Sequence, residues 1–189
     1  MVRGPVAQLG WSVRLIKELR EIPTMDLKDL IPKKTSRGDE IIQRTEGNYI
    51  SIRYERPRAR PKQIKIKRHV DRDTFIVGVT IRACEGTKKR PCELEVSNSS
   101  EVIAQLFIRL LRELGLSESV RLGVHSPRVR VEEFERYWCE TLGLDNFGKP
   151  IIGQSRGRKI KKEIIHIKIY SAVVREVFKY QAENLHQLL

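Results

Sequence analysis

The feature that most constrains this sequence is a nearly all-apolar segment, residues 74–85, that ends on an acid. Every residue from 75 to 85 is apolar or small except Arg82 and Glu85. Asp73 and Thr74, where the segment begins, are typical of a helix start, and Gly86 follows the segment. The sequence predicts a helix over residues 74–85 that is apolar on all sides, and one domain cannot easily bury such a helix completely.

The acid at the end of this segment is placed where a helix dipole disfavours negative charge. One residue beyond Gly86, after Thr87, the chain carries three cations, Lys88, Lys89 and Arg90. An acid at this end indicates that a cation belongs beside Glu85. The partner is either a bound metal ion or a neighbouring side chain, namely Lys88, Lys89 or Arg82.

The net charge of the chain points to a polyanionic partner. The 189 residues carry a formal charge of +13, and a compact protein tolerates such self-repulsion when a polyanion offsets it. Nucleic acid is therefore the first expected partner. An anionic membrane surface is disfavoured because no long basic amphipathic helix supports it. No apolar run has the length of a membrane span, and no apolar stretch typical of a signal peptide follows Met1.

The cysteines Cys84, Cys92 and Cys139 form no CxxC pair, and their odd number argues against a disulfide framework. We expect a reducing, intracellular location, in the cytoplasm and associated with the nucleoid. The Cys and His spacings fit no known zinc-site pattern. The thiols are expected to be small core residues, and Trp138 is expected to lie in the core as well.

The N-terminal part predicts an extension, residues 1–70, ahead of a domain formed by residues 71–189. A short helix is expected over residues 12–22, followed by irregular chain over 24–47 with one helical turn at 27–31. Apolar and polar residues then alternate over 50–54 and 64–67, on either side of a Pro-rich turn. This alternation predicts a basic two-stranded ribbon.

The C-terminal part predicts an α+β fold. Strands are expected over residues 92–97, 120–124 and 163–171, and helices over 100–115, 130–143 and 172–188. Together with the helix over 74–85, this order predicts an antiparallel sheet with helices packed on one face. No internal repeat is present, so the pattern occurs once per chain.

The other face of that sheet is predicted to be basic and to bind nucleic acid. Counting by two from the apolar strand residues gives this face as Arg53, Lys65, Lys67, Arg121, His125, His166, Lys168 and Tyr170. Basic loops flank it, and with them the predicted nucleic-acid-binding residues are Arg53, Lys65, Lys67, Lys88, Lys89, Arg90, Arg121, His125, Arg156, Arg158, Lys161, His166 and Tyr170. Glu93 and Glu95 interrupt the pattern and are expected at a solvent-facing edge or as acceptors from cytosine amino groups. The alternative is an ordinary polar strand exterior.

The stretch "VTIRACEGTKK", followed by a strand ending in "SNSS" and a long amphipathic helix, resembles the LAGLIDADG homing-endonuclease superfamily. It is similar to single-motif members of that group. The shared features are Glu85-Gly86, Asn98-Ser99, the Trp138 helix, the loop 147–150 and the basic strand that contains Lys168. The resemblance covers residues 71–189. Thr80 and Cys84 occupy the places usually held by Gly and Ala.

The resemblance implies a homodimer in which two such helices pack at a two-fold axis, and their terminal acids bind a divalent metal, usually Mg²⁺. In this chain the metal ligands would be Glu85 and the carbonyl of Cys84. Glu85 and Lys168 would then be catalytic in cleaving double-stranded DNA at specific sequences. Lys168 can instead be a solvated strand lysine or a phosphate contact. A non-cleaving DNA- or RNA-binding protein, such as a regulator or an intron maturase, is the alternative, and a basic ribonucleoprotein component is a third.

Overall fold

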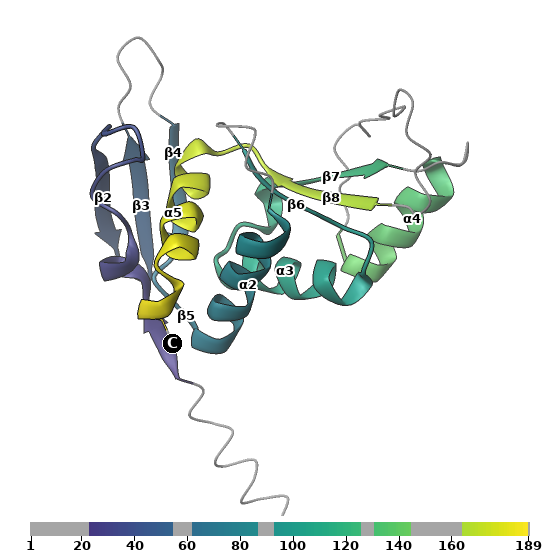
Figure 1. Ribbon diagram of the computed structural model, residues 1–189, viewed down its shortest axis with the longest axis horizontal. Helices are drawn as coiled ribbons and strands as arrows, with labels where there is room; N and C mark the ends of the chain where they lie inside the picture. The colour runs from purple at the N-terminus through teal and green to yellow at the C-terminus, as the bar shows by residue number, and fades with distance from the viewer. Residues whose placement is uncertain (1–22, 55–61, 87–92, 126–130, 145–163, 189) are drawn as a thin grey trace, which may run out of the picture.

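The computed structural model describes residues 23–54, 62–86, 93–125, 131–144 and 164–188, and the expected helix over residues 12–22 lies outside them (Figure 1). The strands are β1 (Thr24–Asp26), β2 (Ile41–Glu46), β3 (Tyr49–Tyr54), β4 (Lys62–Lys67), β5 (His69–Asp71), β6 (Leu94–Asn98), β7 (Val120–His125) and β8 (Ile164–Ile169). The α-helices are α2 (Arg72–Glu85), α3 (Glu101–Glu113), α4 (Val131–Leu142) and α5 (Ala172–Glu183), with 3-10 turns η1 (Leu27–Leu30), η2 (Ser117–Ser119) and η3 (Leu185–Gln187).

The fold is α+β with antiparallel strands, as the order of elements predicts. The described strands form three sheets: β1 pairs with β5, β2-β3-β4 form a second sheet, and β6-β8-β7 form a third with β8 in the centre. In Figure 1, α5 stands between the β2-β3-β4 sheet and the rest of the molecule, and α2 and α3 lie below the β6-β8-β7 sheet. None of the helices in the described part is long and apolar enough to cross a membrane.

The two strands predicted for the basic ribbon pair antiparallel as β3 and β4. The prediction missed a third strand, β2, at the edge of this sheet. β2 pairs along the whole of β3, from Ile41 opposite Tyr54 to Glu46 opposite Tyr49. Only Ile41 is buried in β2, and the last four residues of the strand are exposed. An edge strand of this kind has little apolar alternation, which is the signal that sequence reasoning uses.

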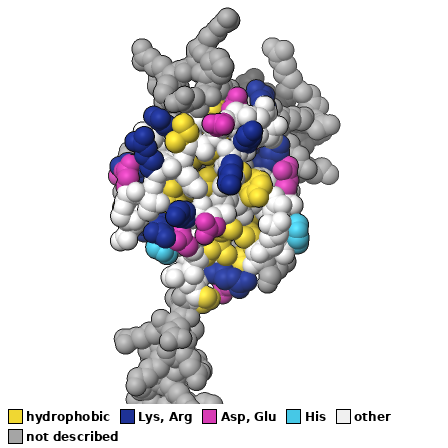
Figure 2. Space-filling view, turned by 90° about the vertical axis from the view of Figure 1, so that its left-hand side faces the viewer, with side chains coloured by type: hydrophobic (Ala, Val, Ile, Leu, Met, Phe, Trp, Pro, Cys, Tyr) yellow, Lys and Arg dark blue, Asp and Glu magenta, His cyan; other side chains and the backbone are white. Residues whose placement is uncertain are grey.

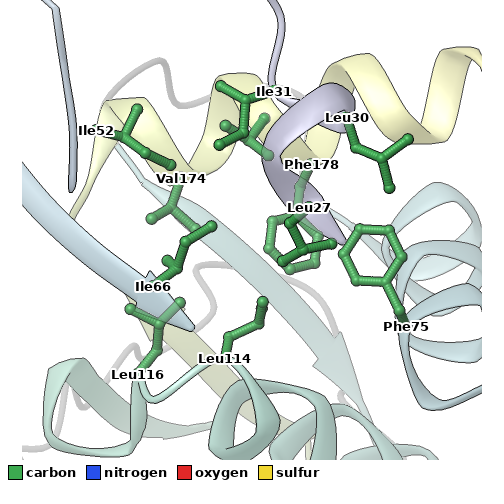
Figure 3. Close-up of a pocket in the computed structure, with 11 residues that line it drawn as sticks. Leu27, Leu30, Ile31, Ile52, Ile66, Phe75, Leu114, Leu116, Val174 and Phe178 are labelled. Atoms are coloured by element: carbon green, nitrogen blue, oxygen red, sulfur yellow. The ribbon is translucent and has the colours of Figure 1, made fainter. Parts of the chain in front are cut away.

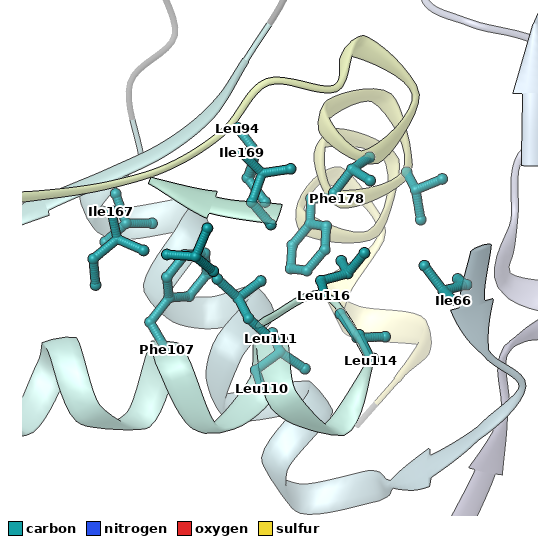
Figure 4. Packing of buried hydrophobic residues seen from close by; sticks show 14 of the residues in the cluster. Ile66, Leu94, Phe107, Leu110, Leu111, Leu114, Leu116, Ile167, Ile169 and Phe178 are labelled. Carbon is teal, nitrogen blue, oxygen red and sulfur yellow. The ribbon is translucent and has the colours of Figure 1, made fainter. Parts of the chain in front are cut away.

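The buried side chains of residues 27–70 belong to the same hydrophobic core as those of the C-terminal part. Ile52 and Ile66 point from the β2-β3-β4 sheet toward α5 and the end of α3 (Figures 3 and 4), and Ile50 of the same sheet is fully buried. On the other side of α5, Leu94, Ile167 and Ile169 of the β6-β8-β7 sheet lie over α3 (Figure 4). The rings of Phe107 and Phe178 meet edge to face between them, with centroids 6.3 Å apart. The division of the chain at residue 70 stays a prediction.

A small apolar cavity lies where these layers meet (Figure 3). Its volume is about 20 Å³, and its lining includes Leu27, Ile52, Phe75, Leu114 and Phe178. A water molecule needs polar partners as well as space, and this lining offers only apolar side chains. The cavity is therefore a packing gap between the layers and not a binding site.

The helices begin at side-chain caps. The Asp71 carboxylate accepts from the Thr74 backbone N–H at 2.7 Å, so α2 begins at Arg72, two residues before the predicted position. The Ser100 and Ser171 hydroxyls accept from Ile103 and Val174 at the starts of α3 and α5. Gly115 follows α3 with a φ of +73°, a conformation that side chains with a Cβ adopt rarely.

Helix α2 approaches α3 closely at Gly78. A Cβ placed on Gly78 would lie 2.8 Å from the Leu110 Cβ and 2.9 Å from its Cγ. Both positions are buried, and Leu110 is fully enclosed. The absence of a side chain at residue 78 therefore sets the distance between the two helices.

We predict that Gly78→Ala lowers the free energy of unfolding by about 1–3 kcal/mol, because the added methyl group forces α2 away from α3. Helix propensity alone predicts the opposite change, since Ala stabilises a helix interior by about 1 kcal/mol relative to Gly. Urea denaturation measures the effect, and Thr80→Ala on the half-buried side of α2 is the control. A more stable Gly78→Ala variant would show that the helices are not in close contact.

Candidate functional site

The end of α2 is open to solvent. Glu85 is its last residue, and both Glu85 and Cys84 are exposed. One side of α2 is left at least partly uncovered by the rest of the chain. Along it lie, in order, Asp73, Val77, Thr80 and Cys84, and Val77 is 40% exposed. The expectation that Cys84 is a core residue was wrong, because this face of α2 points away from α3 and α5. Cys139 is half-buried, and Cys92 lies outside the described residues.

Beneath the exposed end of α2, Arg82 is buried with 5% of its surface exposed. Burial lowers the pKa of Arg82, the nearby Arg175 lowers it further, and Glu95 acts in the opposite direction. A Cβ on Gly86 would lie 2.3 Å from the Arg82 carbonyl oxygen and 2.5 Å from the Cζ of its guanidinium. Gly86 also forms a bridge with Val96 of β6. The end of α2 is thus tied to the edge of the β6-β8-β7 sheet.

Glu95 is the centre of a buried polar cluster on the outward face of the β6-β8-β7 sheet. Its Oε1 lies 2.8 Å from the His166 Nδ1 and 3.6 Å from the Lys168 Nζ. The Ser97 Oγ lies 2.7 Å from the same His166 nitrogen and 3.2 Å from Glu95. Glu95 and Lys168 each have 5% of their surface exposed. Glu95 and Glu93 were expected at a solvent-facing edge, which was wrong because both are buried. The alternative, a contact with cytosine amino groups, stays a prediction.

The residue types of this cluster are those of a hydrolytic triad, but the geometry is not. Ser97 and Glu95 both contact Nδ1 of His166. A triad needs the nucleophile on one ring nitrogen and the carboxylate on the other, so that the ring can pass a proton between them. The cluster therefore does not activate Ser97 as a nucleophile, and its role is to hold charged groups in place.

The cluster keeps Glu95 ionised. The hydrogen bond from His166 and the charge of Lys168 lower the pKa of Glu95 from 4.5 to about 2, against the effect of burial, which raises it. The Lys168 side chain is only 6% exposed. Lys168 was predicted as a catalytic cation, and the structure places it in an ion pair with Glu95.

The remaining predicted binding residues lie on two separate sheets. Arg53, Lys65 and Lys67 belong to the β2-β3-β4 sheet, whereas Arg121, His166 and Lys168 belong to the β6-β8-β7 sheet. They do not form one continuous strand face, so the single basic face predicted from alternation was wrong. Alternation places a residue on a face of its own strand, but it does not assign the strand to a sheet.

On β7, Arg121 is exposed, and its guanidinium donates to the carbonyls of Glu118 and Val120 at 3.0 and 2.8 Å. Tyr170, just after β8, is 50% exposed. The side chain of His125 and all of Lys88, Lys89, Arg90, Arg156, Arg158 and Lys161 lie outside the described residues.

Sequence reasoning missed the cluster around Glu95, although a signal for it exists. In the antiparallel pairing of β6 with β8, Glu95 lies opposite Lys168 and Ser97 lies opposite His166. Opposite charges and hydrogen-bonding groups at facing positions are typical of neighbouring strands. Pairing β6 with β8 by this complementarity would have predicted the cluster.

No group of three or more His, Cys, Asp or Glu side chains in the described ranges could hold a metal ion. No protein-family model matches the chain, and no match is found among curated proteins or solved structures. The resemblance to the LAGLIDADG superfamily therefore stays a prediction.

We predict that Glu95→Gln destabilises the protein at neutral pH by about 3 kcal/mol, because it leaves the buried Lys168 charge without its carboxylate. The folded pKa of Glu95 lies below its ordinary value, so its contribution is present above about pH 4.5 and is lost as the pH falls toward 2. The difference between wild type and Glu95→Gln should shrink over this range. Urea denaturation from pH 2 to pH 7 measures it, with the exposed Glu118→Gln as control. A difference that does not change with pH would contradict the ionised cluster.

Proposed function

We propose that the chain binds double-stranded DNA as a homodimer and cleaves it in a metal-dependent reaction at the exposed end of α2. The observation that carries this proposal is the uncovered side of α2, which presents the exposed side chains of Val77 and Cys84 and ends at the exposed carboxylate of Glu85. Exposed apolar surface on an ordered helix is typical of an interaction site. A second copy of the chain, related by a two-fold axis along α2, would cover this face and bring two Glu85 carboxylates together.

The residues at the end of α2 fit a hard divalent cation as half of a site. One chain offers the Glu85 carboxylate and the carbonyl oxygen of Cys84, and the carbonyls of a last helical turn lack partners within the helix. Mg²⁺ is typically bound by one or two carboxylates together with substrate phosphates and water. Two copies of the chain and one DNA phosphate would supply such a set.

The local electrostatics favour a cation at this position. The negative end of the α2 dipole and the charge of Glu85 act in the same direction. A bound Mg²⁺ would stabilise charge on the attacking and leaving oxygens of the phosphodiester. Glu85 would hold the cation. Gly86 lies between Arg82 and β6, and its position would fix the direction of the chain at Glu85.

The DNA duplex is assigned to the side of the β6-β8-β7 sheet, because the bridge between Gly86 and Val96 brings the end of α2 to that sheet. Arg121 is the exposed cation there in the described part of β7. The net charge of +13 supports binding to a polyanion, and DNA as the substrate agrees with the intracellular location expected from the cysteines. Arg53, Lys65 and Lys67 lie on the other sheet, and this assignment does not need them.

A non-cleaving DNA- or RNA-binding protein is the second candidate, and the position of Lys168 favours it. Lys168 is buried and paired with Glu95, so a catalytic role would require it to leave this cluster. Binding through exposed cations requires no such change.

We predict that Val77→Glu converts the dimer to a monomer, because it places a charge in the apolar contact between the two α2 helices. Analytical ultracentrifugation measures the molecular mass. Val102→Glu is the matched control, since Val102 is an exposed apolar residue on α3. A wild-type protein that sediments as a monomer at high concentration would contradict the dimer.

We predict that Glu85→Gln abolishes Mg²⁺-dependent cleavage and keeps or strengthens DNA binding, because one carboxylate that repels phosphate is removed. The assay incubates wild type and variant with a plasmid that carries the genomic flanks of the gene, with and without Mg²⁺. Glu140→Gln, an exposed acid of α4, should cleave as wild type does. Undiminished cleavage by Glu85→Gln would refute the mechanism, and a wild-type protein that binds but does not cleave would favour the second candidate.

A further inference from the structure

The β2-β3-β4 sheet has a second face that the proposed function leaves unused. Its inner face packs into the core through Ile50, Ile52 and Ile66. By alternation and strand register, the opposite side consists of Ile42, Arg44, Glu46, Tyr49, Ser51, Arg53, Gln63, Lys65 and Lys67. We call these nine residues the outer face.

The outer face is basic. Arg44, Arg53, Lys65 and Lys67 come from all three strands, and Glu46 is its one acid. Glu46 pairs with Lys65 at 2.5 Å, but 57% of the Lys65 side chain and 42% of that of Glu46 remain exposed. A pair so exposed contributes little to the stability of the fold. Figure 2 shows the side of the molecule on which β2 and β3 lie, and this side carries more Lys and Arg side chains than Asp and Glu side chains.

An exposed aromatic ring lies among these cations. Tyr49 is 44% exposed and stands opposite Lys67 in the register of β3 and β4. Gly115 lies beside both residues: a Cβ placed on it would be 3.9 Å from the Tyr49 ring and 3.6 Å from the Lys67 stem. Because the residue beside Tyr49 at this end of the sheet is a glycine, no larger side chain covers the Tyr49 ring there.

A shallow polar hollow lies beside Tyr49 on the same face. Ile42, Arg44, Glu46, Ser51, Arg53 and Gln63 line it. The side-chain amide of Gln63 donates to the Ser51 hydroxyl, which is buried at the bottom of the face. Amide and guanidinium groups at this place can hydrogen-bond to base edges or to phosphate oxygens.

We propose that the outer face binds single-stranded nucleic acid, with one base stacked on Tyr49 and the backbone phosphates on Arg44, Lys65 and Lys67. A sheet surface that combines an exposed aromatic ring with surrounding cations suits unpaired bases, which expose their faces for stacking. A duplex keeps its bases stacked on one another, so it would meet only the cations and leave Tyr49 without a partner. The surface lies outside the site at the end of α2 and does not depend on cleavage.

The test measures binding of a fluorescent oligothymidine of about 12 nucleotides and of a duplex of equal length, by anisotropy at low salt. Tyr49→Ala should weaken binding of the single strand by about five- to 100-fold and leave duplex binding unchanged, whereas Tyr49→Phe should retain both. Tyr180→Ala is the matched control, since Tyr180 on α5 is 40% exposed. Lys67→Ala should reduce the slope of log K against log salt by about 0.7 for the single strand.

The proposal is overturned if wild type does not bind the single strand, or if Tyr49→Ala binds it as wild type does. It is also overturned if Tyr49→Ala weakens single strand and duplex equally, because the surface would then contact only phosphates. These outcomes are independent of Glu85→Gln, which leaves the outer face intact. Failure of cleavage and failure of single-strand binding are therefore distinguishable.

Discussion

The close approach of α2 to α3 at Gly78 is the contact on which the rest of the structure depends. It fixes one side of α2 against Leu110, and α5 covers a second side, so the remaining side is left to solvent. Because α3 carries Leu110 on the same surface that packs under the β6-β8-β7 sheet, the position of α2 also sets where its exposed end meets β6. The uncovered face and the exposed Glu85 are consequences of this one packing arrangement.

Charge is the second organising constraint. A basic chain that folds must separate its cations or pair them, and here it does both. Lys168 is buried in an ion pair with Glu95, and His166 and Ser97 complete the cluster. Arg44, Lys65 and Arg121 stay exposed, on two different sheets. The surface cations are therefore divided between two faces, which allows a double-stranded and a single-stranded partner to be assigned separately.

Local signals predicted the helices well and the sheets less well. The Asn98–Ser100 cap and the glycine at 115 correctly bounded α3, and Trp138 lies in the core as expected. β2 was missed because it buries only Ile41, although Gly47-Asn48 between β2 and β3 is a typical hairpin signal. Glu95 was misplaced because its burial depends on His166 and Lys168, about 70 positions away in the chain.

The sequence by itself determined an α+β chain with a basic charge, a helix that is apolar on nearly all sides, and an acid at the end of that helix. These properties depend on composition and on neighbours within a few residues, so they are visible in the order of the amino acids. Only the tertiary structure decided that Cys84 and Glu85 are exposed, that Lys168 is buried, and that the basic strands belong to two sheets. These outcomes depend on the register and packing of distant segments, because a charged side chain is buried only where the fold supplies its partner.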